Sequence, residues 1–130
     1  MQVIIKTKPM PTPRVRVSRW GAYNVPRYTD YKELIKNSVV VDKVLTGALK
    51  VELIFQIKIP KSWTKKRKAG YKDEIPIGDC DNFAKGIMDA LQKHLFEDDR
   101  QVIELRVQKR YGLSDMIIVR INEVNNDIIN

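Results

Sequence analysis

Residues 50–60 read KVELIFQIKIP, and this stretch decides the fold. Its apolar side chains occupy every second position, at Val51, Leu53, Phe55, Ile57 and Ile59. Successive side chains of a strand point to opposite faces of a sheet, so the alternation predicts a strand with one buried face. Pro60, which lacks a backbone donor, is expected to end the strand.

The segments that follow predict a helix and two more strands. A helix is expected to begin near Asp81 or Asn82 and to run to about Leu95, because one face carries an apolar stripe of Phe83, Ile87, Ala90, Leu91 and Leu95. Two alternating runs follow, VIELRVQKR at 102–110 and MIIVRINEV at 116–124. A short loop containing Gly112 separates them, which predicts a β-hairpin.

The segments before residue 50 predict a strand, an arm and a helix. QVIIKTK at 2–8 is typical of a short strand, and residues 8–30, which hold four prolines, predict an extended and irregular arm. Asp30 and Glu33 have the spacing of a capping box, which predicts a helix from about Tyr31 to the early forties. We therefore expect one α+β domain over residues 1–130, in the order β-α-β-α-β-β, with two helices packed on a small, mostly antiparallel sheet.

Composition narrows the chemistry that this chain can perform. The 130 residues are 43% hydrophobic and 31% charged, which is the balance of a globular protein. One cysteine, Cys80, and one histidine, His94, exclude an internal disulfide, a cysteine-rich zinc site and most histidine-based catalysis. No apolar run is long enough to span a bilayer, and we expect a cytoplasmic protein without a membrane partner.

The net charge of +8 is unevenly distributed. Seven basic and no acidic residues lie between Lys58 and Lys72, most of them in a predicted loop of residues 61–79. A basic surface favours a polyanionic partner such as nucleic acid, with a merely solvated surface as the alternative. We expect the DNA-binding residues to be Arg14, Arg16, Arg19, Arg27, Lys61, Lys65, Lys66, Arg67, Lys68 and Lys72.

An acidic motif follows the basic loop, in IGDCDNFAKGIMDAL at 77–91. Asp79 and Asp81 are placed to converge at a helix start, and Mg²⁺ prefers one or two protein carboxylates. Lys85, one helical turn beyond Asp81, suits a phosphate. Two structural alternatives stay open: the acids cap the helix, or Asp81, Lys85 and Asp89 form an exposed ion ladder.

Three stretches together resemble the RusA-type Holliday junction resolvases. They are D79-x-D81-N82-x-x-K85-x-x-x-D89-A90-L91, D98-D99-R100-Q101-V102 and the proline- and arginine-rich PMPTPRVRV at 9–17. The resemblance implies a RusA-like fold and a dimeric, Mg²⁺-dependent endonuclease of bacteria, phages or prophages, with Mn²⁺ as an alternative ion. The implied function is the resolution of four-way DNA junctions by paired symmetric nicks in recombination and repair. The alternatives are a non-catalytic branched-DNA-binding protein on the same fold and an unrelated interaction module.

The resemblance also assigns roles to individual residues. It implies Asp79, Asp81 and Asp99 as catalytic metal ligands and Lys85 as the catalytic lysine, with supporting roles for Asn82, Asp89 and Asp98. Cys80 departs from the motif, where an apolar residue is commoner, and is interpreted as a small packed side chain.

The predicted helix separates Asp81 from Asp99. A helix of about 14 residues is roughly 20 Å long, too long for a single metal site. Either the helix is shorter, or the chain folds back, or a second copy completes the site. Our hypothesis is a composite site in a homodimer, formed by antiparallel packing of two copies of this helix through Phe83, Ile87 and Leu91.

Overall fold

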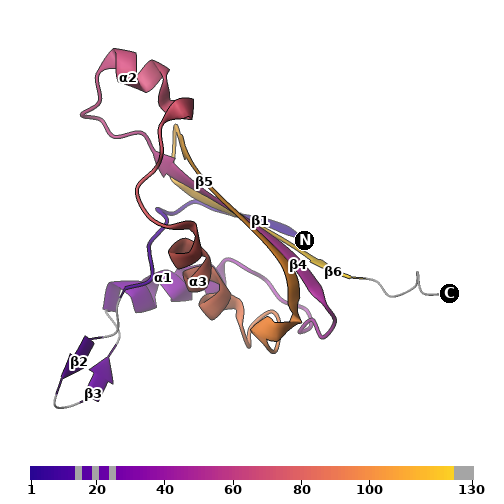
Figure 1. Cartoon of the computed structure of the whole chain (residues 1–130). Helices are drawn as coiled ribbons and strands as arrows, with labels where there is room; N and C mark the ends of the chain where they lie inside the picture. Colours follow the sequence, from indigo (N-terminus) through magenta and orange to yellow (C-terminus); the bar gives the residue numbers. More distant parts are fainter. Residues whose placement is uncertain (14–15, 19–20, 24–25, 125–130) are drawn as a thin grey trace.

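The computed structural model describes residues 1–13, 16–18, 21–23 and 26–124 (Figure 1). The strands are β1 (Gln2–Ile5), β2 (Arg16–Ser18), β3 (Gly21–Tyr23), β4 (Leu49–Lys58), β5 (Val102–Gly112) and β6 (Met116–Glu123). The helices are α1 (Pro26–Asn37), α2 (Lys65–Ala69) and α3 (Cys80–Leu91), with 3₁₀ turns η1 (Tyr71–Asp73) and η2 (Asp99–Gln101). The predicted α+β class is confirmed.

β4 is one of the two inner strands of a four-stranded mixed sheet with the order β1-β6-β4-β5. β6 pairs antiparallel with both β1 and β4, whereas β5 pairs parallel with β4. Parallel neighbours need a crossover connection, and the segment that contains α2 and α3 supplies it. The strand, helix and strand that the sequence predicts in this region therefore form a β-α-β unit.

The predicted hairpin of β5 and β6 is wrong, because β4 lies between the two strands. Their connection at residues 113–115 passes the end of β4 and is anchored there. The Asp115 carboxylate accepts a hydrogen bond from the Lys58 amide at 2.8 Å, and the Ser114 carbonyl accepts one from the Gln56 side chain at 2.9 Å. A short Gly-containing loop thus joins two strands that are next-nearest neighbours.

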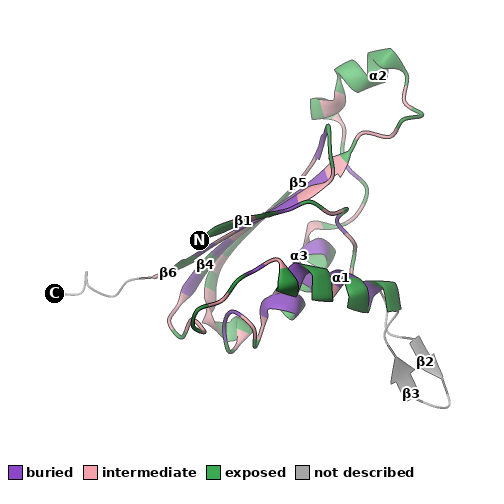
Figure 2. Ribbon diagram, turned by 180° about the vertical axis from the view of Figure 1, so that it is seen from behind, coloured by how far each residue is buried: buried purple, intermediate pink, exposed green. Residues whose placement is uncertain are grey.

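The helices α1 and α3 cover one face of the sheet (Figure 2). The stripe of Phe83, Ile87 and Leu91 is buried against this face, where Val51, Leu53 and Phe55 of β4 are also buried. The opposite face carries ion pairs, including that between Lys50 and Glu104, beside a group of isoleucines, Ile4, Ile54 and Ile118. The proposed packing of two α3 helices through Phe83, Ile87 and Leu91 is therefore wrong, because this stripe forms the core of its own chain.

Both helix boundaries differ from those predicted. α1 begins at Pro26, so Asp30 and Glu33 lie inside the helix and do not form a capping box. Proline at a first helical position is favoured by its fixed φ, and this signal outweighs the capping-box spacing. α3 ends at Leu91, about one turn earlier than predicted, because Lys93 has a left-handed φ of 72°.

The arm and the basic loop contain more regular structure than predicted. Within the arm, β2 and β3 form a small antiparallel sheet. The loop of residues 61–79 includes α2 and η1, and α2 protrudes beyond one end of the main sheet (Figure 1). Thr64 caps α2 by accepting a hydrogen bond from the Arg67 amide.

Candidate active site

A turn at residues 76–78 leads into α3 and sets the start of the acidic motif. Gly78 has a φ of 104°, a conformation that suits glycine. A Cβ at this position would lie 2.5 Å from Cζ of Phe83, so no larger residue fits beside that ring. From the sheet side, the Lys109 ammonium donates hydrogen bonds to the carbonyls of Pro76, at 2.8 Å, and Gly78. The turn is held between α3 and β5.

Asp79 occupies the N-cap position of α3, but its side chain makes no capping hydrogen bond. The helix begins with a backbone bond, in which the Phe83 amide donates to the Asp79 carbonyl at 3.1 Å. The side chain of Asp79 is exposed. The capping alternative therefore does not describe Asp79, whose carboxylate faces solvent at a helix N-terminus, where the backbone dipole favours negative charge.

The exposed side of α3 carries Asp81, Lys85 and Asp89. Among the residues that the structure describes, no carboxylate lies within 4.0 Å of the Lys85 ammonium, so the ion ladder does not form. Asp89 instead accepts a hydrogen bond from the Tyr28 hydroxyl at 3.5 Å. Asp81 and Lys85 thus project from the same face with their charges accessible.

A small polar network ties the proline-rich segment to both helices. The Thr12 hydroxyl donates a hydrogen bond to the Asn82 carbonyl at 2.8 Å. The hydroxyl oxygens of Thr12 and Tyr28 lie 3.4 Å apart. Burial is the main cause of the raised pKa of Tyr28, which therefore stays neutral and able to donate to Asp89. The predicted supporting residues Asn82 and Asp89 both belong to this network, Asn82 through its backbone.

The neighbouring acids Asp98 and Asp99 differ in their contacts. Asp98 is the N-cap of η2, accepts a hydrogen bond from the Arg100 amide at 2.9 Å and forms a capping box with Gln101. The Arg100 amide is the main cause of the lowered pKa of Asp98. Asp99 is the first residue of η2 and is exposed. Asp98 thus has a structural role, which leaves Asp99 as the better candidate for a ligand.

The predicted metal ligands are not gathered within one chain. Across residues 1–13, 16–18, 21–23 and 26–124, no three His, Cys, Asp or Glu side chains lie close enough to hold one metal ion. Asp79 and Asp81 belong to the start of α3, and Asp99 follows the far end of that helix. Asp99 as a ligand stays a prediction.

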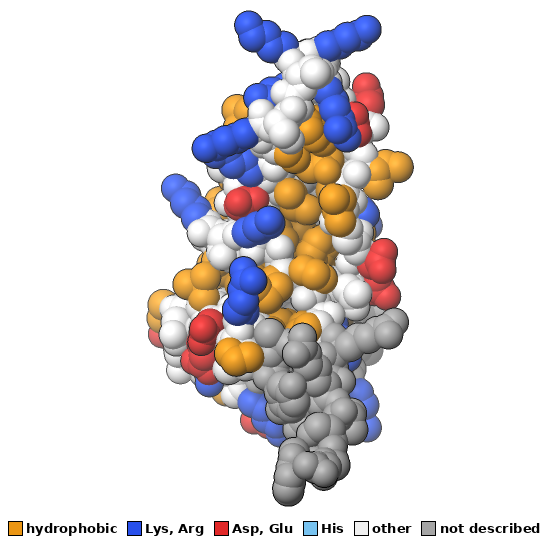
Figure 3. All heavy atoms as spheres, turned by 90° about the vertical axis from the view of Figure 1, so that its left-hand side faces the viewer, with side chains coloured by type: hydrophobic (Ala, Val, Ile, Leu, Met, Phe, Trp, Pro, Cys, Tyr) orange, Lys and Arg blue, Asp and Glu red, His pale blue; other side chains and the backbone are white. Residues whose placement is uncertain are grey.

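Basic side chains surround the end of the molecule that carries α2 (Figure 3). Arg67 is engaged within this segment, because its guanidinium lies 3.9 Å from the Trp63 ring centroid and pairs with Glu74 at 3.1 Å. Trp63 also packs edge-on against Tyr111. The exposed lysines of the segment are Lys61, Lys65, Lys66, Lys68 and Lys72. These five lysines have no carboxylate partner among the described residues, whereas Arg67, which is also exposed, pairs with Glu74; all six stay predicted phosphate contacts.

The arginines of the arm are only partly described. Arg27 is an exposed residue of the first turn of α1. Arg14 and Arg19 lie outside the described residues, and Arg16 is described only by its place in β2. No helix of the described chain is both long and apolar enough to cross a membrane.

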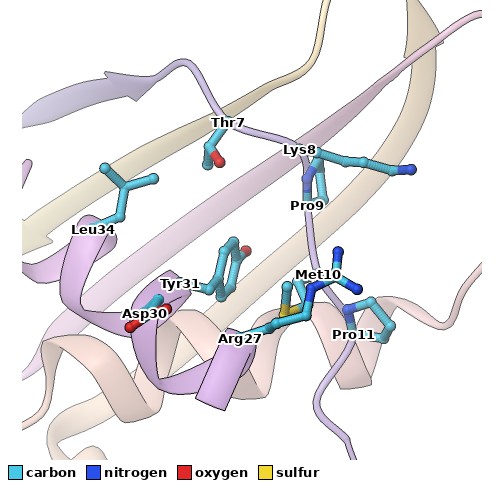
Figure 4. A pocket seen from close by; sticks show the side chains of 9 residues that line it. All are labelled: Thr7, Lys8, Pro9, Met10, Pro11, Arg27, Asp30, Tyr31 and Leu34. Atoms are coloured by element: carbon cyan, nitrogen blue, oxygen red, sulfur yellow. The ribbon is translucent and has the colours of Figure 1, made fainter. Parts of the chain in front are cut away.

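Two cavities flank the segment of residues 8–11. One, of about 450 Å³, lies between this segment, the end of β4 and Gly78, and Lys8, Lys58 and Lys61 are among its lining residues. The other, of about 500 Å³, lies between the segment and α1 (Figure 4). Tyr31 stands in the second cavity, and burial raises its pKa to about 12. The first cavity borders the turn before Asp79.

Three contributors to the site were not predicted from the sequence: Lys109, Thr12 and Tyr28. Lys109 left a signal, because it follows Leu105 and Val107 at the next position of an apolar alternation. A lysine on the buried face of a strand needs polar partners, which a search for carboxylate motifs does not reveal. Thr12 and Tyr28 left no comparable signal, since their contacts join segments far apart in the chain.

Comparison with known proteins identifies the family. Residues 6–122 match the family of the endodeoxyribonuclease RusA. The chain is also 29% identical over 104 residues to a Bacillus subtilis (strain 168) protein that bears the name uncharacterized protein YqaN, a match that covers 75% of this chain and 73% of that protein. This protein belongs to the RusA endodeoxyribonuclease family and is an endonuclease of DNA.

The capping role of Asp98 predicts a pH-dependent contribution to stability. Because folding lowers the pKa of Asp98, its contribution is fully present above the ordinary aspartate pKa of about 4 and is lost as the pH falls through the lowered value. We expect Asp98→Ala to lower the thermal midpoint at pH 7 and to have a smaller effect near pH 3. Asp42→Ala, at an exposed aspartate outside this turn, is the control and should leave the midpoint unchanged. Equal effects of Asp98→Ala at both pH values would contradict this role.

Proposed function

We propose that this protein is a Mg²⁺-dependent endonuclease that resolves four-way DNA junctions by paired nicks. Membership of the RusA family supports nuclease activity. One observation carries the proposal: the Asp79 carboxylate stands exposed at the start of α3, beside Asp81, without serving as a helix cap. In a chain of net charge +8, a pair of solvent-facing carboxylates next to a lysine-rich segment suits a cation and a phosphate together.

The donor set at this helix start fits Mg²⁺. Its oxygen ligands would come from Asp79 and Asp81, and Mg²⁺ usually takes one or two protein carboxylates and keeps several waters. A bound Mg²⁺ would polarise the scissile phosphate and lower the pKa of an attacking water. Lys85, exposed one turn after Asp81, would hold a phosphate oxygen and offset the charge that develops there.

Asp99 would join this site from a second copy of the chain. Two exposed apolar pairs support such a dimer: Ile75 and Ile77, 81% and 85% exposed, precede Asp79, while Ile103 and Leu105, 59% and 45% exposed, follow Asp99 on the edge strand β5. A two-fold contact that covers Ile75 and Ile77 with the partner's β5 edge brings the two acidic segments together in both sites. This contact replaces the antiparallel packing of two α3 helices as the proposed dimer interface.

The DNA would be held by the lysines of residues 61–72 and by Arg27. Phosphate contacts of this kind position the substrate without reading its sequence. The protruding α2 presents Lys65, Lys66 and Lys68 at the end of the sheet, on the same connection that leads into Asp79. The connection thus joins the predicted phosphate contacts to the predicted metal ligands.

The direct test is cleavage of a synthetic four-way junction with and without Mg²⁺, with linear duplex as the control substrate. We expect symmetric nicks in the junction alone. Loss of a partner that merely orients a metal ligand typically costs 10- to 100-fold, so Asp79→Asn should lower cleavage at least about 100-fold. Junction affinity without metal should not fall, and Asp42→Asn, an exposed aspartate outside the motif, should cleave normally. Absence of cleavage with both Mg²⁺ and Mn²⁺ would contradict the proposal and favour a non-catalytic junction-binding protein.

The composite site has its own test in a heterodimer of Asp79→Asn and Asp99→Asn subunits. Each homodimer should be inactive. If Asp99 acts across the dimer, the heterodimer contains one site with both aspartates and one with neither, and it should nick a single strand of each junction. If both residues act within one chain, each subunit of the heterodimer lacks a ligand and no nicking is expected. That second result would contradict the composite site.

The lysines of α2 are tested by the salt dependence of junction binding. Each phosphate contact contributes about 0.9 to the slope of log affinity against log salt concentration. Lys65→Ala/Lys66→Ala should therefore reduce the slope by about 2. Lys36→Ala/Lys43→Ala removes the same charge from exposed positions elsewhere and should preserve the slope. Equal slopes for both double variants would show that α2 does not contact the phosphates.

A further inference from the structure

We propose that Lys109 is a positioning residue for the metal-binding carboxylate of Asp79. The proposal rests on the proposed function, because it concerns the same site. The Lys109 ammonium contacts neither Asp79 nor another acid among the hydrogen bonds and ion pairs of the described residues. It acts through the backbone, by fixing the turn from which Asp79 emerges.

The location of Lys109 on β5 is unusual for a lysine. It lies opposite Phe55 of β4 in the parallel register and follows Val107 on the face that α3 covers. Its side chain is half-buried there, and burial of an ammonium is costly unless polar partners replace water. The carbonyls of Pro76 and Gly78 are those partners, and two of the three ammonium hydrogens are used.

An aromatic pair beside Lys109 also packs against the turn. Phe83 stacks on Phe55 with ring centroids 5.2 Å apart, and the Phe83 ring lies directly against Gly78. Phe55 and Lys109 are partners in neighbouring strands. The turn is therefore bracketed by two side chains anchored at one level of the sheet, and its peptide planes have little freedom to rotate.

Asp79 immediately follows this turn, so the direction of the Asp79 side chain depends on the conformation of the turn. Its carboxylate has no capping bond to hold it, so the backbone is its main constraint among the described residues. Without Lys109, the carbonyls of Pro76 and Gly78 lose their hydrogen-bond donor. The turn would then reorient so that these carbonyls accept hydrogen bonds from water. A metal site tolerates only small displacements of its ligands, so loss of this turn should weaken ion binding before it affects DNA binding.

The test compares Lys109→Met with wild type in three measurements. They are Mn²⁺ binding to the free protein, followed by electron paramagnetic resonance, the Mg²⁺ concentration for half-maximal junction cleavage, and junction affinity without metal. We expect Mn²⁺ binding to weaken and the Mg²⁺ requirement to rise, each roughly tenfold or more, with junction affinity unchanged. Arg106→Met removes a charge from the opposite face of β5 and should match wild type in all three.

Two further variants keep the proposal testable if Lys109→Met does not fold. Lys109→Arg keeps the charge but not the compact ammonium, and should weaken ion binding less than methionine does. Lys109→Gln keeps a hydrogen-bond donor without the charge, and should weaken ion binding with junction affinity retained.

The outcomes separate this proposal from the proposed function. Normal ion binding together with weakened junction binding in the Lys109 variants would make Lys109 a phosphate contact and overturn the proposal. Unchanged values in all three measurements would overturn it as well, while wild-type cleavage would still support the nuclease. If wild type binds Mn²⁺ without cleaving, the nuclease proposal fails and the Mn²⁺ measurement still decides the role of Lys109. If wild type binds no ion, both fail.

Discussion

The stacking of Phe83 on Phe55 is the contact on which the candidate site depends. It joins the first turn of α3 to the inner strand β4, at a ring-centroid distance of 5.2 Å. The Phe83 ring fills the space that a side chain at position 78 would occupy. Position 78 must therefore be glycine, and it has a positive φ. An apolar contact in the core thereby sets the path of the backbone into Asp79.

Charge is arranged around this contact in two opposed groups. Carboxylates at the start of α3 would by themselves repel a phosphodiester, because like charges at a few ångströms interact unfavourably. A cation between them and the phosphate reverses the sign of that interaction, and the lysines of α2 add attraction from the same connection. In the proposed nuclease, the net charge of +8 and the acidic motif with its cation therefore both serve to bind the DNA phosphate.

Periodicity predicts the elements of this fold better than their partners. The alternation at Val51, Leu53 and Phe55 and the stripe on α3 identify a strand and a helix, because one face of each is buried. The same pattern cannot tell which strands are neighbours, and β4 separates the two strands of the predicted hairpin. Of the site, the motif locates Asp79 and Asp81, whereas Lys109 acts through carbonyls that any sequence supplies.

The position of Asp99 follows from the same helix that positions Asp79. α3 has 12 residues and spans about 18 Å at 1.5 Å per residue, with Asp79 before its start and η2 beyond its end. Its apolar stripe is buried against the sheet, so the helix cannot also pair with a copy of itself through that stripe. A metal site that includes Asp99 therefore needs a surface outside the helix, and β5, an edge strand with exposed Ile103 and Leu105, begins directly after η2. The packing of α3 on the sheet thus fixes Asp79 and also keeps Asp99 of the same chain at a distance. For this reason we expect Asp99 to come from a second chain.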